Sequence, residues 1–66
     1  MNVTVNGARH DVDAGTTVAA LLLSLTGTTR GSAAVVDGEV VPRSTWNDHA
    51  LREGQVVELI TAVQGG

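Results

Sequence analysis

The sequence predicts an α+β fold in which one helix lies across one face of a mixed sheet of four to five strands. Three features support this fold class: two hairpin signals at residues 6–7 and 37–38, an apolar helical stripe over 18–25, and a strand-like run at 55–61. A helix packed on one face of such a sheet is the simplest two-layer arrangement of these elements.

The first hairpin is predicted from residues 1–12. Residues 1–5 alternate apolar and polar with period two, which is typical of a half-buried strand. Asn6-Gly7 is the strongest two-residue turn signal, because a type I′ turn needs positive φ at both positions. Residues 8–12 then form the returning strand.

The main helix is predicted over about residues 18–26. Thr16 or Thr17 can cap its N-terminus through a hydroxyl, and Gly27 can end it. Four apolar residues at i, i+3, i+4 and i+7 form the stripe that we expect in the core: Val18, Leu21, Leu22 and Leu25. Leu23 lies off the stripe and is expected to be half exposed.

The second hairpin is predicted at Asp37-Gly38. Residues 33–36 before it are apolar without alternation, which predicts a strand covered on both faces. Residues 39–41 return, and Pro42 ends that strand because it has no N–H to donate. Trp46, the sole aromatic residue of the sequence, is expected to close one end of the core and to need a partner for its indole N–H.

The last strand is predicted over residues 55–61, after a turn at residues 53–54. Its side chains alternate between two faces, one carrying Val57 and Leu59 and the other carrying Val56, Glu58 and Ile60. A crossover that contains the helix joins the first and last strands, so we expect these two strands to be parallel neighbours at the centre of the sheet. This arrangement is the ubiquitin-like β-grasp fold, here a domain of residues 1–61 followed by a flexible tail, 62–66.

Composition limits the possible functions. At 66 residues, the chain is a single domain near the lower size limit for folding without disulfides or metals. The sequence has no cysteine, which excludes disulfides and thiolate chemistry. Its net charge of −3 argues against nucleic-acid binding. No segment approaches the roughly 18 apolar residues of a membrane span and no signal peptide is visible, so we expect a cytoplasmic protein without a membrane partner.

Catalytic and metal-binding side chains are not predicted. The seven carboxylates show no paired spacing of the kind that general acid–base chemistry uses. His10 and His49 lie far apart in the sequence and are interpreted as surface or turn residues. The carboxylates indicate a solvated face, from which we select Glu39 and Glu58 as candidates for partner docking. Arg43 can contact a partner or cap a carbonyl of its own chain.

The sequence closes with Val63-Gln64-Gly65-Gly66. Two glycines without Cβ atoms let a backbone pass through a narrow channel and place no bulk beside a reacting carbonyl. This suits a C-terminus that enters the active site of another protein. A linker or cloning remnant can look the same, so the tail indicates a carrier only together with the fold before it.

Several segments resemble bacterial sulfur-carrier proteins of thiamine biosynthesis, the ThiS type. The similar segments are Asn2-Val3-Thr4-Val5-Asn6-Gly7, Gly15-Thr16-Thr17-Val18, Leu21-Leu22, Val41-Pro42-Arg43 with Trp46, and a Leu-x-x-Gly turn at residues 51–54. The most specific match combines Pro42-Arg43-x-x-Trp46 with the terminal Gly-Gly at this spacing. Gln55 departs from the aspartate that is common there, and the resemblance covers nearly the whole chain.

The resemblance implies a carrier and not an enzyme. A partner of the ubiquitin-activating type uses ATP to adenylate Gly66, and a persulfide or other donor, such as a desulfurase, then converts it to a thiocarboxylate. Thiazole synthase takes the sulfur. Gly65, Gln64 and Val63 give access to the reacting end, and this chain itself binds no cofactor. For docking we expect Val56, Glu58, Ile60, Val40 and Glu39, with the apolar members on the sheet face opposite the helix.

Three alternatives remain open from the residues. Other sulfur carriers, such as the small subunit of molybdopterin synthase or carriers for cysteine or tRNA thiolation, share this fold and tail. A ubiquitin-like modifier would form amide bonds to target lysines. A non-covalent β-grasp interaction module would make no use of the tail.

Overall fold

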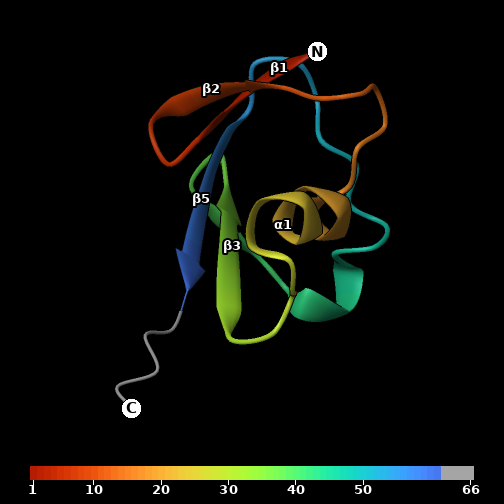
Figure 1. The fold of residues 1–66 in the computed structure, drawn as a ribbon, viewed down its shortest axis with the longest axis vertical. Helices are drawn as coiled ribbons and strands as arrows, with labels where there is room; N and C mark the ends of the chain where they lie inside the picture. The colour runs from red at the N-terminus through yellow and green to blue at the C-terminus, as the bar shows by residue number, and fades with distance from the viewer. Residues whose placement is uncertain (62–66) are drawn as a thin grey trace.

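The computed structural model describes residues 1–61, and within this range the chain forms five strands and one α-helix (Figure 1). The elements in chain order are β1 (Asn2–Val5), β2 (Ala8–Asp11), α1 (Val18–Thr26), β3 (Ser32–Val36), β4 (Glu39–Val41), the 3₁₀ helix η1 (Arg43–Thr45) and β5 (Val56–Thr61). The strand order in the sheet is β2-β1-β5-β3-β4. β1 and β5 are parallel, and the other neighbouring pairs are antiparallel. The predicted β-grasp fold is confirmed.

Both hairpins turn at the predicted residues. Asn6 and Gly7 have φ of 49° and 84°, and Asp37 and Gly38 have φ of 50° and 84°. Positive φ at both central positions is the requirement of a type I′ turn, whose twist matches that of the flanking strands. The two-residue signals therefore fix both hairpins of the sheet.

The helix has the predicted bounds because both of its ends are capped. The Thr17 hydroxyl accepts a hydrogen bond from the Ala20 N–H at 3.1 Å. At the other end Gly27 adopts φ of 80°, and its N–H donates to the Leu23 carbonyl at 2.9 Å. Thr16, the alternative cap, instead donates its hydroxyl hydrogen to the Asp13 carbonyl in the preceding turn.

The predicted core stripe of α1 is wrong at its C-terminal end. Val18, Leu21 and Leu22 are buried, but 42% of Leu25 is exposed. All buried residues of α1 lie within its first five positions, so the core ends before the last turn, where Leu25 lies. Ala19 is buried instead, because the segment around Trp46 packs on the first turn and the Ala19 N–H donates to the Trp46 carbonyl at 3.2 Å. Leu23 is half exposed, as predicted.

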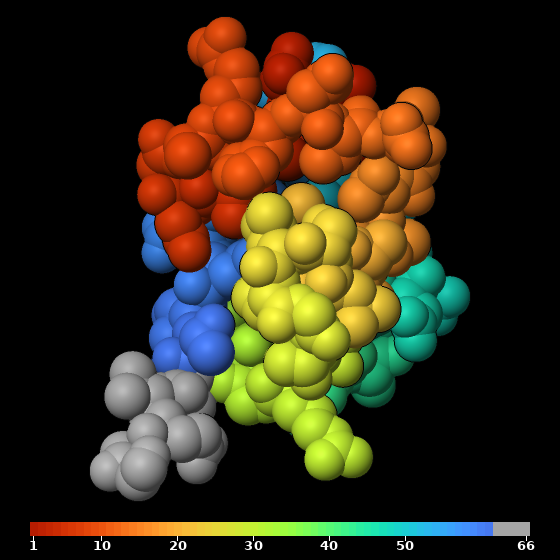
Figure 2. Space-filling view, viewed as in Figure 1, coloured from red at the N-terminus to blue at the C-terminus, as the bar shows by residue number. Residues whose placement is uncertain are grey.

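The prediction that β3 is covered on both faces is also wrong. Ala34 and Val36 are buried under α1, whereas Ala33 is exposed and Val35 is half buried on the opposite face. Figure 2 shows α1 and the first hairpin packed together toward the viewer, with β5 reaching the surface beside them. The described residues contain one α-helix, which covers one face of the sheet. The side chains of β3 on the other face are also apolar, so the sequence of β3 does not show the apolar–polar alternation of a half-buried strand.

Trp46 closes the core as predicted. Only 3% of it is exposed, and its indole N–H donates to the Val41 carbonyl at 2.8 Å. This bond joins the segment after η1 to the end of β4, so a buried polar atom is paired and not left bare. The other core residues come from α1, from the loop before β5 and from every strand except β2: Val3, Val5, Val18, Ala19, Leu21, Leu22, Ala34, Val36, Val41, Leu51, Val57 and Leu59.

Candidate functional site

The sheet face opposite α1 is the candidate docking surface. Strand pairing places residues of β5, β3 and β4 in neighbouring rows, because Val35 lies opposite both Glu58 and Val40, and Ala33 lies opposite Ile60. Successive side chains of a strand point to opposite faces. The open face, as we call it, therefore consists of Ala33, Val35, Val40, Val56, Glu58 and Ile60.

Large apolar side chains are unusually exposed on the open face. The exposed fractions are 73% for Val40, 57% for Ile60 and 48% for Val56. Glu58 is also exposed and lies between Val56 and Ile60 along β5. Several exposed apolar residues gathered on one sheet face make that face the candidate for a protein–protein contact. The structure thus brings together four of the five residues predicted for docking.

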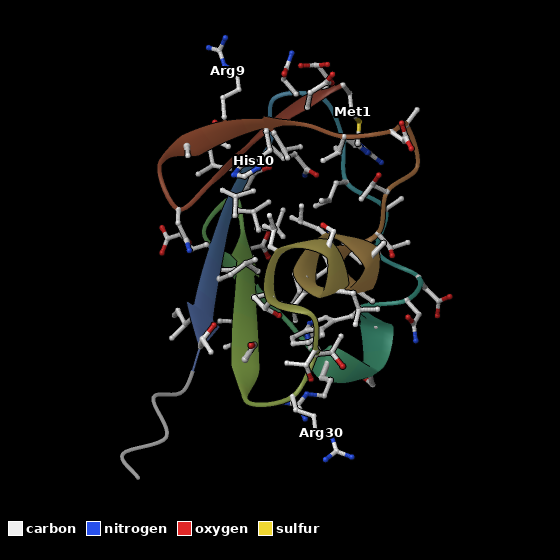
Figure 3. The ribbon with its side chains drawn as sticks, viewed as in Figure 1. Met1, Arg9, His10 and Arg30 are labelled. Atoms are coloured by element: carbon white, nitrogen blue, oxygen red, sulfur yellow. The ribbon has the colours of Figure 1, made fainter. Side chains whose placement is uncertain are left out.

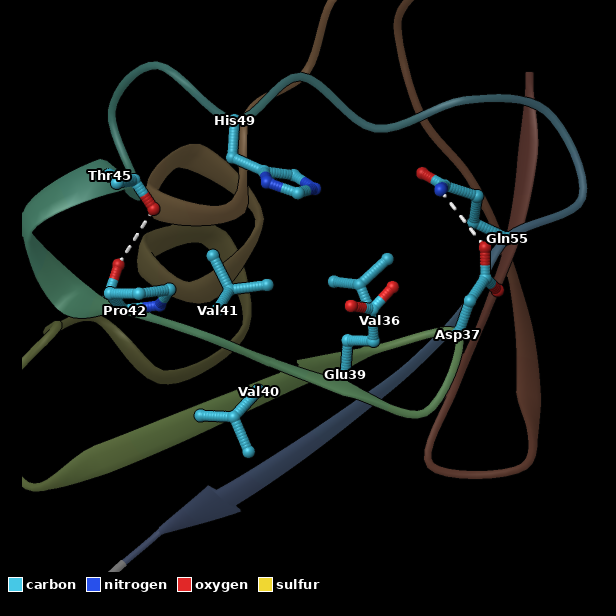
Figure 4. A pocket seen from close by; sticks show the side chains of 9 residues that line it. All are labelled: Val36, Asp37, Glu39, Val40, Val41, Pro42, Thr45, His49 and Gln55. Atoms are coloured by element: carbon cyan, nitrogen blue, oxygen red, sulfur yellow. Dashed lines mark hydrogen bonds between the residues drawn. The ribbon is translucent and has the colours of Figure 1, made fainter.

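The fifth, Glu39, lies on the other face of the sheet. It pairs with Val36, whose side chain is in the core, so the alternation of β4 points Glu39 away from the face that carries Val40. Figure 4 shows Glu39 and Val36 on one side of the β4 ribbon and Val40 on the other. Docking by Glu39 stays a prediction, but a partner on the open face would not meet it there.

Glu39 instead lines an open groove of about 220 Å³ at the β4 edge (Figure 4). Its apolar lining comes from Val36, Val40, Val41 and Pro42, and polar groups of the β3–β4 turn and of the loop before β5 surround it. The Asp37 carboxylate is already engaged there, because it accepts a hydrogen bond from the Gln55 side chain at 3.0 Å. The groove therefore has a structural network along one wall.

The residues predicted to carry and present sulfur are Gly66, Gly65, Gln64 and Val63, and they lie outside the described residues. The described chain ends at Thr61, at the end of β5, one residue after Ile60 of the open face. The strand that supplies half of the open face is therefore the strand that leads into the tail. This is the geometric link between the candidate docking surface and the predicted reactive end.

Arg43 makes contacts within its own chain. Its guanidinium carbon lies 5.6 Å from the centre of the Trp46 ring, and Nη2 lies 3.5 Å from the Ser32 carbonyl oxygen. These contacts hold η1 against the start of β3. The local role that the sequence left open for Arg43 is thus the one that the structure displays.

Sequence reasoning misses two contacts to β5. The sequence marks Asn6 and Asp37 only as turn residues, but the side chain of each also bonds to the backbone of β5. A signal is available, because both turns begin with an Asx residue, whose short polar side chain can pair with nearby backbone. What the sequence does not give is which strand lies within reach.

Within residues 1–61, the remaining polar residues form no evident site. Arg9 and Arg30 point away from opposite ends of the molecule, and the side chain of His10, a residue of β2, points below the β2 ribbon (Figure 3). Across residues 1–61, no group of three or more His, Asp or Glu side chains is placed to hold a metal ion. Over the same residues, no helix has the length and apolar character needed to cross a membrane.

Comparison with known proteins agrees with this geometry. The model of the ThiS family matches residues 3–66. The sulfur carrier protein ThiS of Escherichia coli (strain K12) is 30% identical over 66 residues, which is the full length of both chains. Among solved structures, the crystal structure of a thiamine biosynthesis protein (ThiS) from Geobacter metallireducens has a TM-score of 0.82 at 30% identity, with complete coverage of both chains. The solution structure of a thiamine biosynthesis protein from the same organism has a TM-score of 0.80, covering this whole chain and 88% of the other.

Proposed function

We propose that this chain, which belongs to the ThiS family, is a sulfur carrier of thiamine biosynthesis. Gly66 is the residue that carries the sulfur covalently. The observation that carries the proposal is the family match, which runs through residue 66 and so includes the Gly-Gly pair. The β-grasp body supports it, because the body ends in the strand that leads to those glycines.

The chemistry requires activation of a poor electrophile. A terminal carboxylate has a pKa of about 3.5 and is ionised at neutral pH. In the proposed first step a carboxylate oxygen of Gly66 attacks the α-phosphorus of ATP, and pyrophosphate leaves. A sulfur nucleophile then attacks the carbonyl carbon, and AMP leaves. When that nucleophile is a persulfide, a thiol must afterwards reduce the S–S bond to free the thiocarboxylate.

The proposal assigns catalysis to partners. An adenylating enzyme of the ubiquitin-activating type supplies the ATP site, a persulfide or desulfurase supplies sulfur, and thiazole synthase consumes it. This chain is a co-substrate, so it needs a recognition surface and a reachable end rather than catalytic side chains. Because the adenylation consumes ATP, the proposal places the chain in the cytoplasm.

The open face is the proposed recognition surface for these partners. Val40, Val56 and Ile60 offer apolar area that the fold leaves exposed, and Glu58 adds a charge that a basic partner group can pair with. Half of the open face belongs to β5, so a partner docked on this face lies next to the end of that strand, where the chain continues toward Gly66. Docking there would bring Gly66 into the active site of the same partner.

Sulfur loading tests the function directly. The purified chain is incubated with ATP, the adenylating enzyme of its own organism and sulfide, and its intact mass is measured. We expect one oxygen to be replaced by sulfur in the wild-type chain. A variant without Gly66, and a variant with one added residue after Gly66, should not be loaded, while their free energies of unfolding should match that of the wild type.

The outcomes also separate the alternatives. Loading of either tail variant would contradict Gly66 as the carrier. Conjugates to other proteins would indicate a ubiquitin-like modifier, and an unchanged mass with a competent enzyme would indicate a non-covalent module. If the loaded chain supplies sulfur to molybdopterin synthase but not to thiazole synthase, the carrier belongs to another sulfur pathway.

A further inference from the structure

The backbone of β5 is held by side chains from both hairpin turns. At its start, the Asp37 carboxylate accepts the Val56 N–H at 2.9 Å and the Gln55 side-chain N–H at 3.0 Å. Near its end, the Asn6 side chain accepts the Leu59 N–H at 2.8 Å and donates to the Leu59 carbonyl at 3.2 Å. Two unrelated turns thus reach the same strand from opposite sides.

The Asn6 contact replaces a missing strand. The parallel pairing of β1 with β5 ends at Val5 and Val57, because β1 turns away at Asn6. The Asn6 N–H still donates to the Val57 carbonyl at 2.9 Å. The next backbone groups on that side belong to Leu59, and the Asn6 amide takes both of them as a strand neighbour would.

Beyond Leu59 the two sides of β5 differ. On the β3 side, pairing continues through Ala33 with Ile60 and Ser32 with Thr61. On the β1 side, Asn6 makes the last hydrogen bonds to β5 within the described residues. On the β1 side, the hydrogen bonds of Asn6 are therefore the ones closest to the end of β5 that leads toward Gly66.

We propose that Asn6 is a positioning residue for sulfur loading. Together with the β3 pairing that continues to Thr61, it sets the direction in which β5 runs on toward Gly66 from a docked open face. This rests on the proposed function. A partner that grips the open face must receive the carboxylate at one place in its active site. Reaction rates depend steeply on such placement, because a displacement of about 1 Å can cost on the order of a hundredfold in rate.

The amide suits this role better than a carboxylate does. An Asn side chain has an acceptor and a donor, which match the N–H and the carbonyl of Leu59. An ionised Asp could accept from the N–H but would set its second oxygen against the carbonyl. Asn also tolerates the φ of 49° that the turn demands.

The two hairpins provide a matched pair of variants for the test. Asn6→Gly and Asp37→Gly each remove one clamping side chain from β5, and glycine keeps the positive φ of each turn. One change lies at the outgoing end of the strand and the other at its start. Asp37 holds β5 at Val56, far from the outgoing end of the strand, so its removal is a control for the loss of one β5 clamp and of the stability that it provides.

The kinetic test measures ATP-dependent pyrophosphate release by the adenylating enzyme with each variant as substrate. For Asn6→Gly we expect kcat to fall by roughly tenfold while KM changes by less than about twofold, since the docking surface is intact and only placement is lost. For Asp37→Gly we expect kcat near that of the wild type. Asn6→Asp, which keeps the acceptor but sets its second oxygen against the Leu59 carbonyl, should also fall below the wild-type kcat. Wild-type kcat in Asn6→Gly, or equal losses in both glycine variants, would overturn the proposal.

Amide hydrogen exchange tests the contact between Asn6 and β5 independently of the proposed function, because it needs no adenylating enzyme. In Asn6→Gly, the Leu59 amide should exchange faster while the Val56 amide does not, and Asp37→Gly should show the reverse. If the wild-type chain is not adenylated at all, the proposed function fails, and hydrogen exchange alone then tests whether Asn6 holds β5. Unchanged exchange at the Leu59 amide in Asn6→Gly would overturn the proposed role of Asn6.

Discussion

Single side chains decide which buried groups stay paired. The indole of Trp46 and the carbonyl of Val41 satisfy each other inside the core, and no ring without an N–H can replace that bond. The bond is also a junction, because the backbone carbonyl of Trp46 receives the N–H of Ala19 at the start of α1. One residue thus joins β4, η1 and α1.

Trp46→Phe should lower the free energy of unfolding by about 2 kcal/mol, because a buried carbonyl loses its donor. Urea unfolding followed by circular dichroism measures the change. Leu23→Ala, on the half-exposed side of α1, is the control and should change stability by less than about 0.5 kcal/mol. Equal effects of the two changes would contradict the assigned role of the indole bond.

Residues on the two faces of β5 have different roles: those on the open face are available for partner binding, and those on the other face stabilise the core. Ile60→Glu should weaken binding of the adenylating enzyme more than it lowers stability, since Ile60 is 57% exposed on the open face. Val57→Ala, at a fully buried position of the same strand, should do the reverse and cost about 2 kcal/mol of stability. Calorimetric binding and urea unfolding of both variants check the pair. Parallel losses of binding and stability in Ile60→Glu would place that residue in the core.

At the scale of elements, local signals predict boundaries better than burial. The caps and turn residues act through their own backbone, so the sequence locates α1, both hairpins and the end of β4 correctly. Burial of Leu25 and of the outer face of β3 depends on how many layers the whole chain can supply. A window of sequence contains no information on that, which explains why both predictions are wrong.

Gly27→Ala should cost about 1 kcal/mol, because the left-handed conformation that ends α1 is unfavourable for a residue with a Cβ. The space around Gly27 is open, with nothing within 4 Å of an added Cβ, so the cost is conformational and not steric. Gly27→Asn should therefore lose clearly less, since Asn tolerates this conformation. Thermal unfolding of the two variants measures the difference, and equal losses would point to a clash instead.

For the whole molecule, the candidate site is predictable in part. The apolar–polar alternation along residues 55–61 correctly predicts that Val56, Glu58 and Ile60 share one face of the sheet. The register between β4 and β3, which separates Glu39 from Val40, is set by pairing across the hairpin. The contact of Asn6 with Leu59 is not predictable from local sequence either, because it spans 53 residues.

The parallel pairing of β1 with β5 has a consequence for synthesis. The strand at the centre of the sheet is the last of the described strands to leave the ribosome, so β1 and β3 wait for their shared neighbour until translation is nearly complete. Contacts between such distant segments make folding slower than local ones do. A nascent chain that is cut short before β5 lacks both a closed sheet and the strand that leads to the glycines, so the body of the domain cannot fold until β5 has been made.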